Sequence, residues 1–397
     1  MTSLPYPIIK LKKGKERSLL QKHPWVFSGA IAQEPAELNN GDLVQVVSNQ
    51  GDFLASGHFQ RGTISIRCLD FEGEILDENF FRKKIRNSFQ LRKQLSFPNQ
   101  QTNSFRLIHG EGDGMPGLIA DVYGNTVVLQ SYTLGMQSLK TLLAKLILEE
   151  LPFIDAVYDK SAETMAKHGH VKPENNFILQ RDNYIADEIV YEHGLKLSVD
   201  FIHGQKTGFF IDQRDNRQLL KKYSENKTVL NTFAYTGGFS LAALQGNANE
   251  VHSVDSSARA IEGLNYNIDL NKFKGLHQSA TSDVMSYLRQ LEMQYDILIL
   301  DPPAFAKHLN QASNAMIGYR NLNTEGLKHV KPGGLLFTFS CSQAIDKELF
   351  RKIIFQSAIQ ANKEVKILHQ LTQPADHPVS IYHPEAEYLK GLVLFVE

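Results

Sequence analysis

Three side chains that can do chemistry are predicted to follow hydrophobic strands in the C-terminal half of this 397-residue chain: Asp255, Asp301 and Cys341. A thiolate is a nucleophile, and carboxylates accept hydrogen bonds or take part in proton transfer. In an open parallel sheet the ligand crevice lies outside the carboxyl ends of the strands, so we expect these residues to converge. Each also has an ordinary structural interpretation, because aspartate often caps a turn and cysteine is often a small core residue.

Strands that alternate with helices are predicted from about residue 191 onward, which is typical of a doubly wound parallel sheet. A third strand should finish near Asp283, and a Pro-Gly-Gly sequence at 332–334 should introduce the fifth. The other predicted strands are 228–233, 251–254, 297–300, 335–339, 365–371 and 392–396. This part of the chain is therefore predicted to be an α/β domain whose chemistry lies at one edge of its sheet.

A glycine-containing turn connects the first of these strands to a helix. Gly237 and Gly238 lie at this turn, where glycine lets a ligand approach the backbone beside the helix N-terminus. Asp255 follows 18 residues after Gly237, where a carboxylate can accept both hydroxyls of a ribose. The G-x-G-x-x-G dinucleotide fingerprint is absent, and a Gly-Gly pair alone is more often only a turn.

The N-terminal half has a different pattern. Alternating residues at 42–47 and 63–69 predict strands, and 48–52 predicts a hairpin turn, so residues 6–72 are expected to form a small all-β barrel. Phe81, Ile85 and Phe89 then fall on one helical stripe. The predicted domains are a β-barrel at 1–73, a helix and polar linker at 74–104, a central α+β domain at 105–190 and the α/β domain at 191–397.

Composition indicates a globular protein with a local basic bias. Hydrophobic residues make up 42%, charged residues 21%, and the net charge is −1. No apolar run approaches the roughly 20 residues that cross a bilayer, and two cysteines cannot build a disulfide framework, so a cytoplasmic location is expected. Residues 1–30 carry six basic side chains and one acidic side chain, and residues 76–95 carry six basic and two acidic side chains. Such basic stretches can bind phosphate groups or form a solvent-exposed helix face, and the charge alone favours neither interpretation.

A set of motifs spread over the chain resembles one family of enzymes. The strand-end residues resemble those of class I S-adenosylmethionine (SAM)-dependent methyltransferases, whose Rossmann-like domain has a mostly parallel seven-stranded sheet. The whole pattern resembles the bacterial 23S ribosomal RNA cytosine-5 methyltransferases with an N-terminal PUA domain. The matching segments are His23–Ala30, Gly112–Leu118, His203–Arg214, Tyr235–Gly238, Asp301–Pro303, Phe339–Ser342 and Ala375–Pro378.

This resemblance implies SAM as cofactor. It places the ribose on Asp255, the adenine amino group on Asp283, and the methionine portion on the turn that begins at Tyr235. The segment that contains Gln213 would close over the cofactor. The implied cofactor-binding set is Gln213, Tyr235, Thr236, Gly237, Gly238, Asp255, Asp283, Asp301 and Pro302.

The resemblance also gives Cys341 a specific role. Carbon 5 of a pyrimidine is a weak nucleophile, and attack of a thiolate on C6 raises its electron density. Cys341 is the cysteine placed for this attack, and Asp301 is the expected partner for the edge of the base, as an acid or a hydrogen-bond acceptor. Cys68 alternates in phase with Ile64 and Ile66 and is predicted to be a core residue.

The expected partner is 23S ribosomal RNA, with the target nucleotide flipped out of its stack or unpaired. The PUA module is an RNA-binding unit, and a homodimer is left open. The predicted substrate-binding residues are Pro303, Phe305, Tyr319 and Arg320 near the base and Lys12 and Lys13 in the barrel. For the base that removes the C5 proton, the sequence leaves Lys206, His308 and His377 as alternatives.

Other functions remain open from the residues alone. A uridine-C5 methyltransferase needs the same thiol. An exocyclic-amine methyltransferase needs none, and it commonly has an aromatic residue directly after Asp-Pro-Pro, where this chain has Ala304 before Phe305. A non-catalytic RNA-binding assembly factor would not need Asp255, Asp301 and Cys341. Neither a metal-ligand spacing nor a P-loop sequence is recognisable, so no metal is expected.

Overall fold

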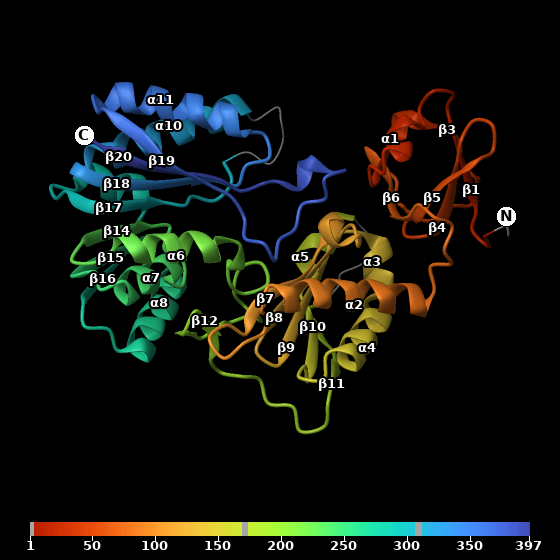
Figure 1. The fold of residues 1–397 in the computed structure, drawn as a ribbon, viewed down its shortest axis with the longest axis horizontal. Coiled ribbons are helices and arrows are strands. Elements are labelled where there is room, and N and C mark those ends of the chain that lie inside the picture. The colour runs from red at the N-terminus through yellow and green to blue at the C-terminus, as the bar shows by residue number, and fades with distance from the viewer. Residues whose placement is uncertain (1–3, 169–173, 306–311) are drawn as a thin grey trace. The chain divides into compact units, whose positions relative to one another are not determined.

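The computed structural model describes residues 4–168, 174–305 and 312–397, and it divides the chain into two compact units (Figure 1). The N-terminal unit comprises residues 1–191, 199–209 and 375–386. The C-terminal unit comprises residues 192–198, 210–374 and 387–397. The chain therefore passes between the units several times. Residues 375–386 return to the N-terminal unit, and residues 387–397 then complete the C-terminal unit.

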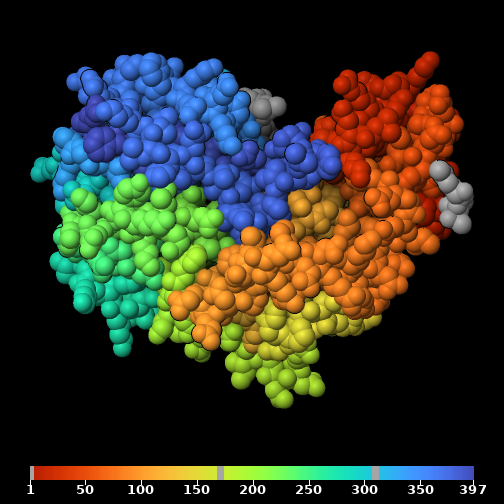
Figure 2. Space-filling model, in the orientation of Figure 1, coloured from red at the N-terminus to blue at the C-terminus, as the bar shows by residue number. Residues whose placement is uncertain are grey.

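The first domain of the N-terminal unit is a six-stranded sheet in the order β2-β6-β5-β4-β1-β3, and its residues gather in one lobe, red to dark orange in Figure 2. The predicted strands at 42–47 and 63–69 are confirmed as β4 and β6, and Cys68 is buried in the core beside Ile66. The elements are β1 (Ile8–Leu11), α1 (Arg17–Leu20), β2 (Trp25–Phe27), η1 (Ser28–Ala30), β3 (Ile31–Gln33), β4 (Leu43–Val47), β5 (Phe53–Phe59) and β6 (Ile64–Asp70).

A five-stranded sheet in the order β11-β10-β9-β8-β7 forms the second domain of this unit. Helix α2 (Glu78–Gln94) begins at Asp77, whose side chain accepts a hydrogen bond from the Phe80 N–H, and its apolar stripe lies in the core of this sheet. The remaining elements are β7 (Ser104–His109), η2 (Gly110–Asp113), β8 (Leu118–Tyr123), β9 (Thr126–Ser131), α3 (Leu134–Ser138), α4 (Lys140–Glu150), β10 (Ala156–Asp159), α5 (Ala162–Met165), η3 (Ala166–His168) and β11 (Asn176–Gln180).

Two motifs far apart in the sequence meet inside the N-terminal unit. The fully buried Arg92 forms an ion pair with Asp113 and donates a hydrogen bond of 2.8 Å to the Asp376 carbonyl. At Gly112 an added Cβ would lie 1.8 Å from the Pro378 carbonyl oxygen, so only glycine allows this approach. The Gly-Asp-Gly and Ala-Asp-His-Pro motifs therefore hold residues 375–386 in place.

The C-terminal unit is built on a seven-stranded sheet in the order β16-β15-β14-β17-β18-β20-β19, which confirms the predicted fold class. In the spatial order of the sheet, the five strands from β16 to β18 are all parallel to their neighbours within that group, and β20 is antiparallel to both β18 and β19. The strands are β14 (Thr228–Thr232), β15 (Glu250–Asp255), β16 (Leu276–Thr281), β17 (Tyr295–Leu300), β18 (Val330–Ser340), β19 (Val365–Leu371) and β20 (Lys390–Val396), and β12 (Val190–Glu192) and β13 (Leu195–Leu197) form a separate pair.

Helices cover both faces of this sheet, with α10 and α11 on one face and α6 and α7 on the other (Figure 1). Side chains alternate along β17 accordingly, so that Leu298 and Leu300 face one layer and Ile297 and Ile299 the other. The helices are η4 (Ile211–Gln213), α6 (Arg214–Tyr223), α7 (Gly238–Gln245), α8 (Ala258–Asn271), α9 (Val284–Gln290), α10 (Ala312–Lys328) and α11 (Lys347–Ala361). The short helix η6 (Pro384–Ala386) belongs to the N-terminal unit.

One detail of this sheet differs from the sequence prediction. Residues 332–334 lie within β18 at an irregularity in its pairing with β17, because the strand begins at Val330. Strand β19 has the predicted bounds, and as an edge strand it leaves Ile367 and Leu368 about half exposed. Among the described residues, no helix has the length and apolar character needed to cross a membrane.

A buried ion pair anchors the start of α6 in the C-terminal unit. Arg217 donates two hydrogen bonds of 2.6 Å to the carboxylate of Glu192, and a third of 2.9 Å to the Phe210 carbonyl. Both charged side chains are at most 2% exposed. This pair fixes residues 210–217 against the strand pair β12–β13.

We predict that Glu192→Ala lowers the free energy of unfolding by about 3–5 kcal/mol, because the buried Arg217 would lose the carboxylate that accepts two of its hydrogen bonds. Urea unfolding followed by circular dichroism measures this change. Glu325→Ala breaks the partly exposed ion pair with Lys328 and should cost less than about 1 kcal/mol. Equal effects of the two substitutions would contradict the assigned role of the buried pair.

Candidate active site

The predicted site residues follow the carboxyl ends of neighbouring parallel strands in the C-terminal unit. Asp255 ends β15, Asp283 follows β16, Asp301 follows β17 and Cys341 follows β18. Leu300 pairs with Thr338 across β17 and β18, so the chain leaves both strands at nearly the same level. The structure therefore brings these strand ends to one edge of the sheet, as the alternation of strands and helices predicts.

The turn from β14 to α7 has an unusual backbone. Phe233, Tyr235 and Gly237 have φ angles of +53°, +47° and +89°. Gly237 has no room for a side chain, because an added Cβ would lie 2.8 Å from the Leu264 Cγ. Strained conformations of this kind persist where the surroundings hold them, and they concentrate at ligand sites.

Asp255 is held by this turn. Its two carboxylate oxygens accept hydrogen bonds of 2.9 Å, one from the Tyr235 N–H and one from the Ser257 N–H. A carboxylate has about four lone-pair positions, so each oxygen can still accept a hydroxyl hydrogen. Together with the N-terminus of α7, this arrangement fits a ligand that carries a ribose and a polar tail.

Asp283 is the N-cap of α9, where it accepts a hydrogen bond of 2.9 Å from the Ser286 N–H. Hydrogen bonds from Ser286 lower the pKa of this carboxyl group. The capping role accounts for one oxygen, and the other can accept a hydrogen bond from an amino group. Both the structural and the ligand-binding interpretation of Asp283 therefore fit the geometry.

Asp301 lies in an environment that opposes its charge. Burial, with a further contribution from the nearby Asp212, raises the pKa of Asp301 to about 7, and a hydrogen bond from Gln213 opposes the shift. Gln213 is buried and its Oε1 accepts a hydrogen bond of 2.6 Å from Asn216, which turns its amino group toward other acceptors. Asp212 in turn accepts a hydrogen bond of 2.6 Å from the Tyr388 hydroxyl.

Cys341 is partly exposed, and its thiol is affected by the same charges. Burial raises the pKa of the Cys341 thiol to about 12, with further contributions from Asp301 and Asp212, whereas Lys390 acts in the opposite direction. The thiol is therefore protonated at neutral pH. A reactive thiolate requires either the loss of a neighbouring negative charge or a stronger influence of the lysine.

Lys390 is a functional candidate that the sequence analysis missed, because it took the last strand to begin at Leu392. Its ammonium group donates hydrogen bonds of 2.8 Å to the Ser342 carbonyl and 2.7 Å to the Tyr388 carbonyl. Burial lowers the pKa of Lys390 to about 8. The pairing of Lys390 with Ser340 is the signal that places it here, and it follows from the antiparallel addition of β20.

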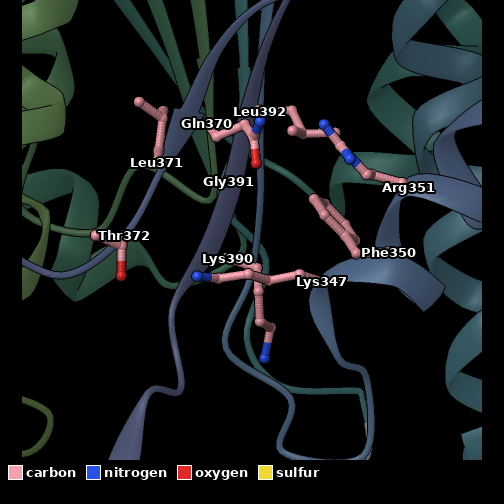
Figure 3. Close-up of a pocket in the computed structure, with 9 residues that line it drawn as sticks. All are labelled: Lys347, Phe350, Arg351, Gln370, Leu371, Thr372, Lys390, Gly391 and Leu392. Atoms are coloured by element: carbon pink, nitrogen blue, oxygen red, sulfur yellow. The ribbon is translucent and has the colours of Figure 1, made fainter. Parts of the chain in front are cut away.

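A cavity of about 100 Å³ lies beside this lysine, as Figure 3 shows. Its lining includes the cationic side chains of Lys347, Arg351 and Lys390 together with Phe350. The ring of Phe350 also belongs to the core on this face of the sheet. The cavity therefore offers positive charge and an apolar wall beside Lys390.

Tyr319, one of the predicted substrate contacts, lies in the core of the C-terminal unit. Tyr319 is fully buried, its ring lies 4.6 Å from that of Phe305 between centroids, and its hydroxyl forms a hydrogen bond of 2.9 Å with Ser342. Its hydroxyl therefore supports the turn that carries Cys341, and in this structure its ring is enclosed by the core. Phe305 itself is 37% exposed, and Arg320 on α10 is half-buried.

The remaining predicted residues are distributed as follows. Pro302 is buried and Pro303 is exposed, as expected for a loop that borders a site. Lys12 and Lys13 are exposed after β1 in the N-terminal unit, where Lys12 donates a hydrogen bond of 3.0 Å to the Gly29 carbonyl. Thr236 lies in the strained turn of the C-terminal unit and is half-buried.

The three alternatives for the final base gain no support from the geometry. Lys206 is an exposed turn residue of the N-terminal unit. His377 in the same unit is buried, pairs with Asp376 at 3.0 Å and lies against His109, so packing accounts for it. His308 lies outside the described residues.

Comparison with known proteins agrees with this geometry. Residues 9–71 match the PUA-like domain family, and residues 106–394 match the family described as S-adenosylmethionine-dependent methyltransferase. The ribosomal RNA large subunit methyltransferase I of Shigella dysenteriae is 38% identical over 387 residues, which are 96% of each chain. The protein of that name from Vibrio parahaemolyticus is 38% identical over 390 residues, 96% of this chain and 98% of the other.

Solved structures share the fold. A protein from Streptococcus mutans described as a SAM-dependent methyltransferase has a TM-score of 0.83 at 24% identity, covering 98% of this chain and 100% of its own. A methyltransferase structure complexed with SAH has the same TM-score and identity and covers 98% and 99% of the two chains. At 24% sequence identity, these similarities show that the fold is shared.

We predict that the charge of Asp301 controls the reactivity of Cys341. Asp301→Asn should accelerate alkylation of Cys341 by iodoacetamide by about tenfold above pH 7, where the wild-type carboxyl group is ionised and opposes the thiolate. Below pH 7 the two rates should converge, because the raised pKa leaves the wild-type carboxyl group protonated there. Lys390→Met should slow the reaction, because it removes the cation that favours the thiolate.

Mass spectrometry of the Cys341 peptide measures these rates, and the buried Cys68 is the internal control for unfolding. Rates that are identical in wild type and Asp301→Asn across the whole pH range would contradict the electrostatic account.

Proposed function

Because the chain belongs to the ribosomal RNA large subunit methyltransferase I family of SAM-dependent methyltransferases, we propose that it transfers the methyl group of SAM to C5 of a cytosine in 23S ribosomal RNA. SAM is its cofactor. The observation that carries the finer proposal is the position of Cys341 beside Asp301 at the ends of adjacent strands. A pyrimidine C5 methylation requires a thiol at such a position, and an amine methylation does not.

The strained turn and the two aspartates supply the expected cofactor contacts. Asp255 would accept both ribose hydroxyls with its remaining lone pairs, and Asp283 would accept a hydrogen bond from the adenine amino group. The turn from Tyr235 to Gly238 would face the methionine portion, and Gln213 and Pro302 would border it. Bound SAM supplies an electrophilic methyl group on its sulfonium.

Cys341 would act as the nucleophile. Its thiolate forms a bond to C6 of the base, and the electron pair of the C5–C6 double bond moves toward C5, which becomes nucleophilic enough to accept the methyl group. The C5 proton then leaves to a base, the C5–C6 double bond forms again, and the C6–Sγ bond breaks to return the thiolate. The side chain of Cys341 would therefore be unchanged after one turnover.

Asp301 would bind the pairing edge of the cytosine. Cytosine presents an acceptor at N3 and a donor at its amino group, and a protonated carboxyl group presents the complementary donor and acceptor. The raised pKa of Asp301, about 7, makes the protonated form accessible at neutral pH. Its hydrogen bond to N3 would also stabilise the negative charge that develops on the ring after attack at C6.

The same interaction would activate the thiol. A neutral Asp301 no longer opposes ionisation of Cys341, and the ammonium group of Lys390 favours the thiolate. The enzyme would therefore keep an unreactive thiol until a base binds. Lys390 would act as a positioning and electrostatic residue, because it holds the Ser342 carbonyl one residue after the nucleophile.

RNA recognition is assigned to several surfaces. Phe305 is exposed beside the site and would stack on the flipped base, with Pro303 and Arg320 on the same segment or the following helix. Lys12 and Lys13 of the PUA-like domain would contact phosphates. Ribosomal RNA as substrate agrees with a cytoplasmic location.

A uridine-C5 methyltransferase is the alternative that the site chemistry also allows. A protonated Asp301 is complementary to uracil as well, with donor and acceptor exchanged, and the thiol has the same role. The nature of the product nucleoside therefore decides between the two.

We predict that wild-type protein forms 5-methylcytidine when incubated with tritiated SAM and 23S ribosomal RNA, measured by nucleoside analysis after digestion. Cys341→Ala should lose activity by about 1,000-fold or more, because the reaction then has no nucleophile. Cys68→Ala is the matched control and should remain active. 5-Methyluridine, a methylated purine, or an active Cys341→Ala variant would overturn the cytosine-C5 proposal.

A further inference from the structure

A second cluster of chemically active side chains lies in the N-terminal unit, outside the site described above. His23 precedes β2, and His383 and Glu385 lie at η6, so the three residues come from opposite ends of the chain. One nitrogen of each histidine and one oxygen of Glu385 lie within 4.8 Å of one another. The sequence contains no local metal-ligand spacing here, which is why the cluster was not predicted.

His383 is the unusual member of this cluster. It is only 2% exposed, and neither ring nitrogen has a hydrogen-bond partner among the described residues. Its ring lies 4.2 Å from that of Trp25 between centroids, and its Nε2 lies 3.7 Å from Glu385 Oε2. A buried polar group without a partner is costly, so this histidine lacks a group that would bind its lone pair.

His23 is oriented toward the same point. Its Nε2 lies 3.5 Å from Glu385 Oε1, and its Nδ1 lies 3.4 Å from the Trp25 carbonyl oxygen. The Trp25 N–H donates a hydrogen bond of 3.2 Å to the same Nδ1. Binding of a cation at Nε2 would therefore move the ring proton to Nδ1, where the Trp25 carbonyl oxygen can accept it. Histidines that bind metals usually donate their second ring N–H to a carbonyl or carboxylate in this way.

We propose that His23, His383 and Glu385 bind one divalent transition-metal cation of the zinc type, with water completing the coordination. Two imidazoles and one carboxylate form a ligand set known from zinc sites. In tetrahedral zinc the ligand atoms are about 3.4 Å apart. Each histidine lies near that distance from one of the two Glu385 oxygens, and one ligand atom from each residue falls within 4.8 Å of the others. Small rotations of the side chains close the remaining separation between the two histidines.

Surrounding groups suit a cation. The carboxylate of Glu111 accepts a hydrogen bond of 2.8 Å from the Trp25 indole N–H, which fixes the ring that packs on His383 and adds a negative charge nearby. The ligands come from the PUA-like domain and from residues 375–386, so the cation would join these two parts of the N-terminal unit. Its role would be to stabilise this junction, and it is independent of the methyl-transfer chemistry.

The test is zinc binding by the full-length protein after removal of metals with EDTA, measured by isothermal titration calorimetry with zinc chloride. We expect one equivalent to bind, and we expect His383→Ala and the isosteric Glu385→Gln to weaken binding by more than about 100-fold. His203→Ala is the matched control, because His203 forms an exposed pair with Asp200 that lies outside the cluster.

Cobalt(II) substitution of the wild-type protein gives a second readout. We expect the visible absorption of four-coordinate cobalt without a thiolate charge-transfer band, because no cysteine belongs to the ligand set. The proposal is overturned if wild-type protein binds no zinc, if Glu385→Gln and His383→Ala bind it as tightly as wild type, or if a thiolate band appears and disappears in Cys341→Ala.

Discussion

The site depends on the parallel pairing of β14 to β18. Ladder hydrogen bonds and burial on both faces fix the register of these strands, because a shift by one residue would move every side chain to the opposite layer. With the register fixed, β17 and β18 end side by side, and the residues that follow them, Asp301 and Cys341, must share one environment. The chemistry of the thiol and of the carboxyl group is therefore coupled by the sheet itself.

That environment is negative and poorly hydrated, and its balance depends on side chains that other segments supply. Asp212 adds charge to Asp301 and Cys341 from the segment that the Arg217–Glu192 pair anchors. The antiparallel strand β20 places Lys390 next to the turn of Cys341 and provides the opposing charge. This arrangement accounts for a protonated thiol in the resting protein, and under the proposed function a bound base would favour the thiolate.

Much of this was predictable from the sequence, because strand-helix alternation and the strand-end residues Asp255, Asp301 and Cys341 are local signals. The roles of Tyr319 and Lys390 were not, because one depends on burial beneath a turn and the other on which strand pairs with β18. The apolar run at 365–371 predicted the bounds of β19, and its edge position follows only from the strand order. The cluster of His23, His383 and Glu385 depends on a contact between the two ends of the chain, for which no local pattern exists.

The central claim is the covalent bond between Cys341 and C6 of cytosine, and a 5-fluorocytidine-substituted fragment of 23S ribosomal RNA tests it directly. Fluorine replaces the C5 proton that must leave before the C6–Sγ bond can break, so the adduct should accumulate. The account predicts a SAM-dependent protein–RNA complex that survives denaturing electrophoresis in wild type and Cys68→Ala and is absent in Cys341→Ala. An adduct that persists in Cys341→Ala, or no adduct from a wild-type protein that methylates unmodified RNA, would contradict it.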